Sequence, residues 1–240
     1  MNTDSLKALW KTVFGDTNAF IDSFFRIAYS PDRCRYMEEN GEASCALYWF
    51  DCSYEGGRLA YIYAVATHPE HRKKGLASQL LRQTHDHLQQ LGYAGTVLKP
   101  AKGLFPFYER LGYVTSGFIR RFHADTATAP ARLTELSPEA YGRHRRNFLP
   151  RNAVIQERLT LDFLHSYASF YAAGDALISA IPQDGVVLEY LGNPLSAPGI
   201  LAALGISDAE IPTVGCEIPF TMFYPLNCTK TPGYLGITLE

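Results

Sequence analysis

The sequence lacks any hydrophobic run long enough to cross a membrane, and its first residues, Met1–Ser5, show no basic-then-apolar signal pattern. Its five cysteines are an odd number and form no C-x-x-C pair, which argues against a disulfide framework or a zinc site. A net charge of −2 argues against general nucleic-acid binding, because such an interface is usually basic. We therefore expect a cytoplasmic protein with reduced thiols and with no membrane, nucleic-acid or metal partner.

Two common phosphate-binding motifs are also missing. There is no G-x-x-x-x-G-K-[ST], so a Walker-type nucleotide site is unsupported, and there is no G-x-G-x-x-G after a strand, so a Rossmann dinucleotide site is unsupported. The composition is 47% hydrophobic and 19% charged over 240 residues, which is ordinary for a globular chain of one large or two small domains.

A strand, a basic loop and a helix follow one another in the segment 61–88. Tyr, Ile and Val residues up to Thr67 favour a strand, and Pro69 ends it because proline has no N–H for a sheet ladder. Leucines then recur at the spacing of a helix: Leu76, Leu80, Leu81 and Leu88. The segment 72–78 is therefore predicted to lie where a helix begins.

The start of this helix is a predicted anion site. Its first backbone N–H groups have no partner within the helix, and the helix dipole favours negative charge there. Gly75 and Ala77 carry almost no side chain, so a phosphate can approach the backbone closely, while Arg72, Lys73 and Lys74 add positive charge. The pattern predicts a ligand that carries a diphosphate; a solvated basic helix end is the alternative.

The pattern Arg72-x-x-Gly75-x-Ala77 resembles the acyl-CoA loop of the GNAT acetyltransferase superfamily, whose usual form is Gln/Arg-x-x-Gly-x-Gly/Ala. The resemblance implies acetyl-CoA as co-substrate. The loop residues implied as its ligands are Arg72, Lys73, Lys74, Gly75, Leu76, Ala77 and Ser78. In the family the strands on either side of the helix splay apart, which implies that the backbone of Val65, Ala66 and Thr67 pairs with the pantetheine arm like an added strand.

The segment Phe105-Pro-Phe-Tyr-Glu-Arg-Leu-Gly-Tyr113 resembles the GNAT signature FYERLGF, with Tyr113 in place of the final Phe. The resemblance implies that Tyr108 faces the thioester sulfur and acts as general acid. The chemistry suits a tyrosine, because the leaving thiolate has a pKa near ~8.5 and must be protonated. The alternative is that Tyr108 is one aromatic residue of a core-facing stripe with its neighbours.

The order of elements predicts an α/β fold with a mixed sheet and helices on its faces, as in the GNAT core. Expected helices cover residues 4–14, 17–29, 76–90, 137–148 and 159–166. The resemblance to the GNAT signature implies a further short helix around Tyr108. Expected strands cover residues 44–54, 59–67, 96–100, 118–122, 169–172, 176–181, 186–191 and 234–239.

The chain is expected to divide into residues 1–123, a GNAT-like domain with the acetyl-CoA site, a linker at 124–131, and a smaller α+β part at 132–240. The last part echoes the helices and the strand–turn–strand of the first, but Gly192-Asn193-Pro194 stands where a basic loop would be needed. We interpret it as a degenerate GNAT-like half without a CoA loop, since some members of the superfamily are tandem copies; an unrelated α+β cap is the alternative.

The predicted function is N-acetyltransfer from acetyl-CoA to a primary amine of a small molecule or peptide by direct attack. A non-catalytic acyl-CoA-binding or regulatory module is the alternative. From Leu159 on, Lys230 is the only Lys or Arg, and such an acidic half would suit a cationic amine, but acids that simply solvate a surface and its turns are the favoured explanation. Asp51, Glu189 and Glu240 are the candidate general bases, and spacing singles out none of them.

Overall fold

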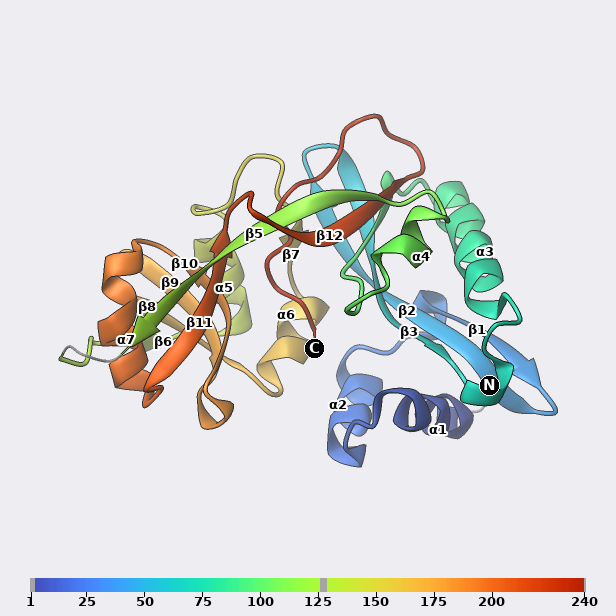
Figure 1. Cartoon of the computed structure of the whole chain (residues 1–240), viewed down its shortest axis with the longest axis horizontal. Helices are drawn as coiled ribbons and strands as arrows, with labels where there is room; N and C mark the ends of the chain where they lie inside the picture. Colours follow the sequence, from blue (N-terminus) through green and yellow to red (C-terminus); the bar gives the residue numbers. More distant parts are fainter. Residues whose placement is uncertain (1–2, 126–128, 240) are drawn as a thin grey trace.

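The computed structural model describes residues 3–125 and 129–239, which form a mixed sheet with helices on its faces (Figure 1). The α-helices are α1 (Thr3–Phe14), α2 (Asn18–Ile27), α3 (Leu76–Gln90), α4 (Phe105–Glu109), α5 (Pro138–Arg145), α6 (Leu159–His165) and α7 (Ala197–Leu204). Short 3-10 turns are η1 (Pro31–Arg33), η2 (Pro69–His71), η3 (Pro182–Asp184) and η4 (Pro194–Ser196). Among the described residues, no helix combines the length and apolar character needed to span a membrane.

The strands are β1 (Cys34–Glu39), β2 (Glu42–Tyr54), β3 (Gly57–Thr67), β4 (Gly95–Leu98), β5 (Val114–Asp125), β6 (Thr134–Glu135), β7 (Ile155–Gln156), β8 (Ser169–Ala173), β9 (Ala176–Ile181), β10 (Val186–Leu191), β11 (Asp208–Val214) and β12 (Ile218–Pro225). Their order in the sheet is β1-β2-β3-β4-β12-β5-β11-β10-β9-β8-β6, and β7 pairs with β2. Most neighbours are antiparallel, but β3 with β4 and β10 with β11 are parallel, so the expected mixed α/β sheet is confirmed.

Successive side chains of β2 point to opposite faces of the first part of the sheet, and both faces are buried. Tyr48 and Phe50 face the core under α1, α2 and α6, whereas Leu47 and Trp49 face the core under α3. This is the period of two that a strand imposes on its side chains. The expected helix after Thr17 begins there, because the Thr17 side chain accepts a hydrogen bond from the Phe20 N–H and caps α2.

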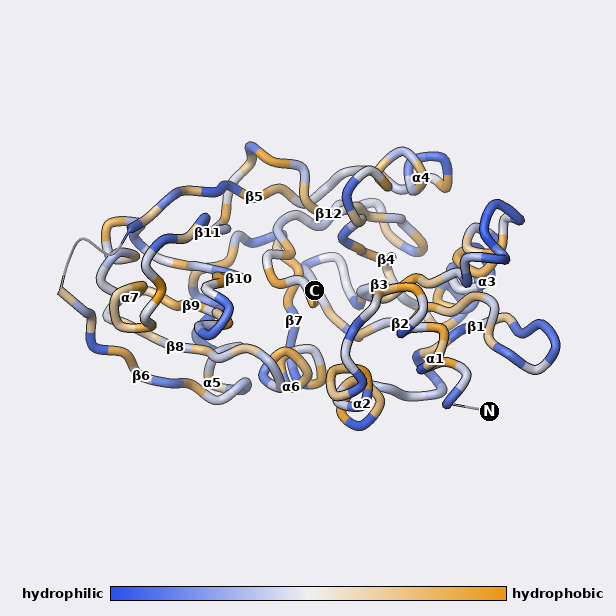
Figure 2. Tube along the Cα trace, turned by 60° about the horizontal axis from the view of Figure 1, so that its bottom comes forward, coloured by the Kyte–Doolittle hydropathy of each residue, from blue (hydrophilic) through white to orange (hydrophobic). Residues whose placement is uncertain are grey.

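The two parts of the sheet repeat one order of elements. The first part runs α1, α2, β1, β2, β3, α3, β4, and the second runs α5, α6, β8, β9, β10, α7, β11. In each part four strands lie in chain order, and the last two are parallel strands joined across a helix. The crossover helix α7 is mostly hydrophobic (Figure 2) and packs on the core of the second part through Ile200 and Leu201.

Two strands join the parts. The long strand β5 runs from one part to the other in Figure 1, pairing with β12 near its start and with β11 toward its end. Strand β12 inserts between β4 and β5, so a segment from beyond residue 132 lies inside the sheet of the first part. Of the expected linker, Ala124 and Asp125 are the last residues of β5, and residues 126–128 lie outside the described residues.

The expected final strand at 234–239 is wrong. This segment has no strand pairing, yet Leu235, Ile237 and Leu239 are buried. Side chains from the second part hold it instead: Gln156 Nε2 donates to the Ile237 carbonyl at 2.8 Å, and Arg145 Nη2 donates to the Leu235 carbonyl at 2.9 Å. Apolar residues that suggested a strand therefore pack as an irregular segment between the two parts, with a tight turn at Gly236, where φ is +69° and the Ile237 N–H donates to the Leu235 carbonyl at 2.9 Å.

Candidate functional site

The predicted strand, loop and helix are present. β3 ends at Thr67, η2 follows, and α3 begins at Leu76 with Gly75 as its N-cap. Gly75 has a φ of +81°, which only glycine adopts at little cost, and no heavy atom lies within 4 Å of a Cβ built there. The loop is therefore shaped for a ligand that comes close to its backbone.

A cavity of about 800 Å³ lies against this loop, and we call it the loop cavity. Of the predicted site residues, those that line it are Val65, Thr67, Arg72, Lys73, Gly75, Leu76, Ala77, Ser78 and Tyr108. Ala66 is buried and Lys74 is exposed, and neither lines the cavity. Because α3 is 15 residues long, its free N–H groups and dipole make this cavity suited to an anion.

Strand β3 has an open edge beside the loop cavity. Its parallel ladder with β4 ends at the pair Tyr61 and Val97, and β3 continues to Thr67 beyond it. The β2–β3 register also shifts here, since Ala46 pairs with Ala66 but Tyr48 pairs with Tyr63. Two residues of β3 thus oppose one of β2, which is a β-bulge, and it turns the backbone of Ala64 and Val65 toward the cavities.

Ala64 in this bulge has a φ of +48°, a strained conformation for a residue with a side chain. Such strain costs on the order of 1–3 kcal/mol and clusters at functional sites. The sequence gives no sign of this conformation, because residues with a positive φ are usually glycines and position 64 is an alanine.

Tyr108 lies on α4 at the meeting point of two cavities. Its side chain is 6% exposed, and burial raises the pKa of its hydroxyl to about 12. The group therefore stays protonated at neutral pH and can act as a proton donor. The rings of Phe107 and Tyr113 pack against it edge-on, at centroid distances of 5.0 and 5.5 Å, and hold its orientation.

The second cavity, of about 540 Å³, is rich in aromatic side chains, and we call it the aromatic cavity. Its lining is Trp10, Phe14, Asp16, Phe20, Tyr61, Ile62, Tyr63, Ala64, Val65, Leu98, Lys99, Ala101, Lys102, Leu104, Tyr108 and Leu239. Phe14, Val65, Leu104 and Tyr108 line both cavities. The two hollows therefore meet at the predicted catalytic tyrosine and at the open edge of β3.

Behind Tyr108 lies a buried polar chain. The Tyr113 hydroxyl is 2.8 Å from His85 Nε2 and 2.9 Å from Thr96 Oγ1, so Tyr113 uses the hydroxyl that distinguishes it from the family's Phe. The His85 ring also stacks on Tyr224 at 4.0 Å. Burial lowers the pKa of His85 to about 4, so this imidazole is neutral at physiological pH.

Neither Asp51 nor Glu189 lies in the aromatic cavity, so the structure does not support either as general base. Asp51 accepts hydrogen bonds from Tyr93 and Arg58 at 2.5 and 2.9 Å on another face of the sheet. Glu189 is fully buried against Arg145. Glu240 lies outside the described residues. Sequence reasoning missed Asp16, which lines the aromatic cavity, because it reads as a simple helix breaker after Gly15.

Three residues of the described chain could hold a cation. His68, Glu70 and His71 present ligand atoms that lie within 4.8 Å of one another. His71 Nδ1 is 2.8 Å from the Glu39 carboxylate and 3.3 Å from Lys74 Nζ, so a cation at this nitrogen would have to displace both contacts. The group flanks the loop cavity, which His71 also lines.

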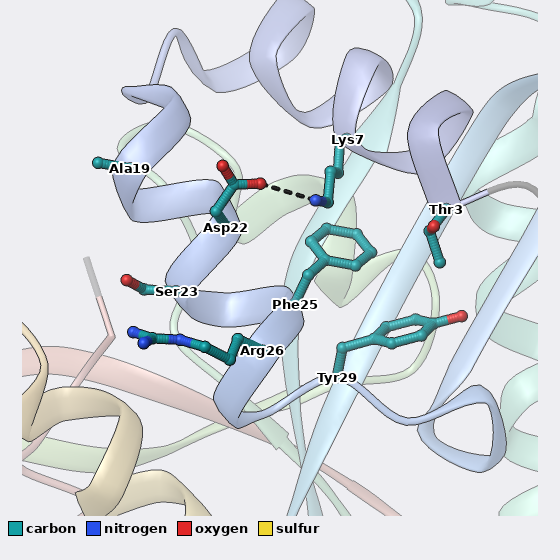
Figure 3. A pocket seen from close by; sticks show the side chains of 8 residues that line it. All are labelled: Thr3, Lys7, Ala19, Asp22, Ser23, Phe25, Arg26 and Tyr29. Atoms are coloured by element: carbon teal, nitrogen blue, oxygen red, sulfur yellow. Dashed lines mark hydrogen bonds and ion pairs between the residues drawn. The ribbon is translucent and has the colours of Figure 1, made fainter.

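A further hollow of about 620 Å³ lies between α1 and α2, away from the predicted residues (Figure 3). Lys7 and Asp22 form an ion pair across it at 2.7 Å, and Phe25 lies beneath Lys7. It contains no predicted catalytic or binding residue. The loop and aromatic cavities, joined at Tyr108, are therefore the candidate active site.

The structure thus places a helix N-terminus at the open edge of a strand, with the buried Tyr108 beside it. Residues 2–116 match the family model described as an acetyltransferase (GNAT) domain. This part of the chain, just under half of its length, is therefore similar to the GNAT acetyltransferase domain. None of the curated proteins matches the sequence.

Solved structures of similar fold extend beyond that domain. A GCN5-related N-acetyltransferase from Anabaena variabilis matches with a TM-score of 0.73 at 15% identity, covering 94% of this chain and 71% of its own. A putative acetyltransferase from Pyrococcus horikoshii matches with a TM-score of 0.68 at 14% identity, and the match covers 98% of this chain and 90% of the Pyrococcus chain. Eis1 from Mycobacterium abscessus matches with a TM-score of 0.65 at 12% identity, covering 94% and 71%. At these identities the likeness shows the fold.

Proposed function

We propose that the protein is an N-acetyltransferase that moves the acetyl group of acetyl-CoA to a primary amine of a small molecule or peptide by direct attack. The observation that carries the proposal is that Tyr108 and Val65 line both cavities. A donor bound in the loop cavity and an acceptor bound in the aromatic cavity would meet at these two residues. Such proximity can supply several kcal/mol of the barrier.

The loop cavity is the proposed acetyl-CoA site. The backbone N–H groups of Leu76, Ala77 and Ser78 would bind the pyrophosphate at the start of α3, with Arg72 and Lys73 as charge partners. Arg72 is anchored for this by a hydrogen bond from its Nε to the Thr67 carbonyl at 3.3 Å. The open edge of β3 at Val65–Thr67 offers main-chain groups to the pantetheine amides.

Each group at the meeting point of the two cavities would have one role in the reaction. As the amine nitrogen bonds to the carbonyl carbon and the C–S bond breaks, Tyr108 donates its proton to the leaving sulfur. Because burial raises its pKa to about 12, Tyr108 carries that proton through the neutral and alkaline range, and it is a weaker acid than an exposed tyrosine. Backbone N–H groups at the Ala64–Val65 bulge would stabilise the negative charge that develops on the carbonyl oxygen.

The second part of the sheet is proposed to be a GNAT-like half without a co-substrate site. The repeated element order and the two parallel crossovers support this. Its crossover helix α7 is preceded by η4, with the sequence Pro-Leu-Ser, and has no basic residue there. One acetyl-CoA is therefore expected to bind per chain.

The test is acyl transfer to a panel of primary amines, with the product measured by mass because the exposed Cys216 and the half-buried Cys228 would react with a thiol reagent. Tyr108→Phe should keep acetyl-CoA binding and lose on the order of 10²-fold in turnover. The matched control is Tyr171→Phe in β8, remote from both cavities, and it should leave turnover unchanged. Binding of acetyl-CoA without transfer to any amine by the wild type would instead support a non-catalytic acyl-CoA-binding module.

A further inference from the structure

Charged side chains in the aromatic cavity are few. Of the residues that line it, the charged ones are Asp16, Lys99 and Lys102. Asp16 lies in the short turn between α1 and α2, two residues after Phe14, which lines both cavities. Asp16 is thus the one carboxylate among the described lining residues. Its near neighbour in sequence, Phe14, lines both cavities where they meet, which is where transfer would occur.

The Asp16 carboxylate is held by a buried partner. Trp10 Nε1 donates a hydrogen bond to Asp16 Oδ2 at 2.7 Å, and Trp10 itself is 2% exposed. Its ring is packed by Phe24 at 4.6 Å and Tyr63 at 5.6 Å, so the donor cannot move freely. A carboxylate accepts several hydrogen bonds at once, so this contact fixes Asp16 without exhausting it.

The rest of the wall is apolar or aromatic. Rings of Trp10, Phe14, Phe20, Tyr61 and Tyr63 line the cavity together with leucines. Aromatic faces attract a single ammonium group and also accommodate a hydrophobic body. Lys99 and Lys102 carry positive charge in the same wall, although the Lys99 ammonium lies 5.4 Å from the ring of Phe220, which is outside the lining. Such charges oppose a ligand with several ammonium groups more strongly than a ligand with one.

The geometry points to Asp16 as the carboxylate that binds the acceptor's ammonium group and takes its proton, for an amine with one positive charge and an aromatic or other apolar body. This inference rests on the proposed acetyltransfer. In the balanced step, one N–H proton of the ammonium passes to Asp16, and the freed lone pair forms the N–C bond. The C–S bond then breaks and the sulfur receives the proton of Tyr108. The surplus N–H proton of the new amide returns to the Tyr108 oxygen, so the net proton released is the one that Asp16 gives up to solvent.

The experiment compares Asp16→Asn with Asp22→Asn in the otherwise intact protein. Asparagine keeps an oxygen for the Trp10 N–H but loses the charge and the basic site. Asp22 lies on α2 in the separate hollow of Figure 3, where its ion pair with Lys7 is largely exposed, so it is a matched control. The probes are phenethylamine, with one ammonium and an aromatic ring, and spermidine, with several ammonium groups.

We expect the same acetyl-CoA-induced rise in melting temperature in all three proteins. With phenethylamine near neutral pH, kcat/KM should fall on the order of 10²-fold in Asp16→Asn and stay unchanged in Asp22→Asn. The deficit should narrow as the pH approaches ~10, where an alkylamine loses its own proton without help. A role of Asp16 in folding alone would not give this pH dependence. Spermidine should be the poorer acceptor for the wild type.

Different outcomes separate the two proposals. Equal kcat/KM in Asp16→Asn and wild type, or a deficit that is constant with pH, would overturn the role of Asp16 and leave acetyltransfer standing. Faster transfer to spermidine would overturn the preference for an acceptor with one positive charge. A wild type that binds acetyl-CoA but acetylates neither probe while acetylating other amines would overturn the acceptor class. Transfer to no amine at all would overturn both.

Discussion

The backbone N–H of Leu239 donates a hydrogen bond to the hydroxyl oxygen of Tyr61 at 3.4 Å, across 178 positions of sequence. Tyr61 lies on β3, at the last pair of its ladder with β4, and both residues line the aromatic cavity. The segment 234–239 therefore forms part of the wall of the candidate active site. The second part of the sheet holds that segment, so it contributes to the site without a cofactor loop of its own.

Leu239→Ala should weaken binding of the acceptor. It removes a side chain that is 1% exposed and that lines the aromatic cavity but not the loop cavity. We expect a loss of about 2–5 kcal/mol in unfolding free energy and a raised KM for the amine, with the affinity for acetyl-CoA unchanged. Leu235→Ala, equally buried in the same segment, should cost similar stability but leave that KM unchanged. Equal effects of both variants on KM would contradict this account.

Deprotonation of Tyr108 should not lower turnover in the alkaline range. A general acid works while it is protonated, and burial raises the pKa of Tyr108 to about 12. Turnover at saturating amine should therefore not fall between about pH 8 and about pH 10, where an ordinary tyrosine is half deprotonated. A fall centred near ~10 in the wild type, absent in Tyr108→Phe, would show that the tyrosine ionises normally and would contradict its burial.

Stability should decline in mild acid because of His85. Its folded pKa of about 4 lies below the unfolded value of about 6.5, so the unfolded chain binds the proton more readily. The stability is fully present above about 6.5 and is lost as the pH falls toward about 4, by up to about 3 kcal/mol. Urea unfolding across this range measures the slope. His85→Gln should flatten it, and an unchanged slope would assign the acid sensitivity to other groups.

Breaking the buried ion pair of the second part should be costly. Arg145 and Glu189 are 1% and 0% exposed on their side chains, and the Glu189 carboxylate also accepts hydrogen bonds from Tyr141 and Tyr234. Glu189→Gln leaves the Arg145 charge buried without its partner, which should cost about 3–5 kcal/mol in denaturant unfolding. Glu139→Gln removes an exposed partner of Arg143 and should cost less than about 0.5 kcal/mol. Similar losses in both variants would be unexpected.

Local sequence signals were sufficient to predict many of the elements in the first part of the sheet. The strand up to Thr67 and the glycine at the start of α3 follow from proline, glycine and the spacing of leucines. The same signals predicted β9 and β10, which match residue for residue the expected 176–181 and 186–191. The helix that holds Tyr108 was expected from the resemblance to the GNAT signature.

The remaining features depend on long-range pairing, which local patterns do not encode. Strand β12 inserts between β4 and β5, and residues 234–239 alternate like a strand but are held by Arg145 and Gln156. The bulge at Ala64 carries no glycine, and the place of Asp16 in the wall depends on how the α1–α2 turn meets β3. None of these could be inferred from the spacing of residues alone.

Thermal unfolding of the wild type and of an Arg72→Glu/Gly75→Glu variant, each with and without acetyl-CoA, is the decisive measurement for a co-substrate site at the loop cavity. A ligand that binds the folded state must raise the melting temperature. The account predicts a rise for the wild type, its absence in the variant, and a calorimetric stoichiometry of one acetyl-CoA per chain. No rise at saturating acetyl-CoA, or an equal rise in the variant, would contradict a co-substrate site at this loop.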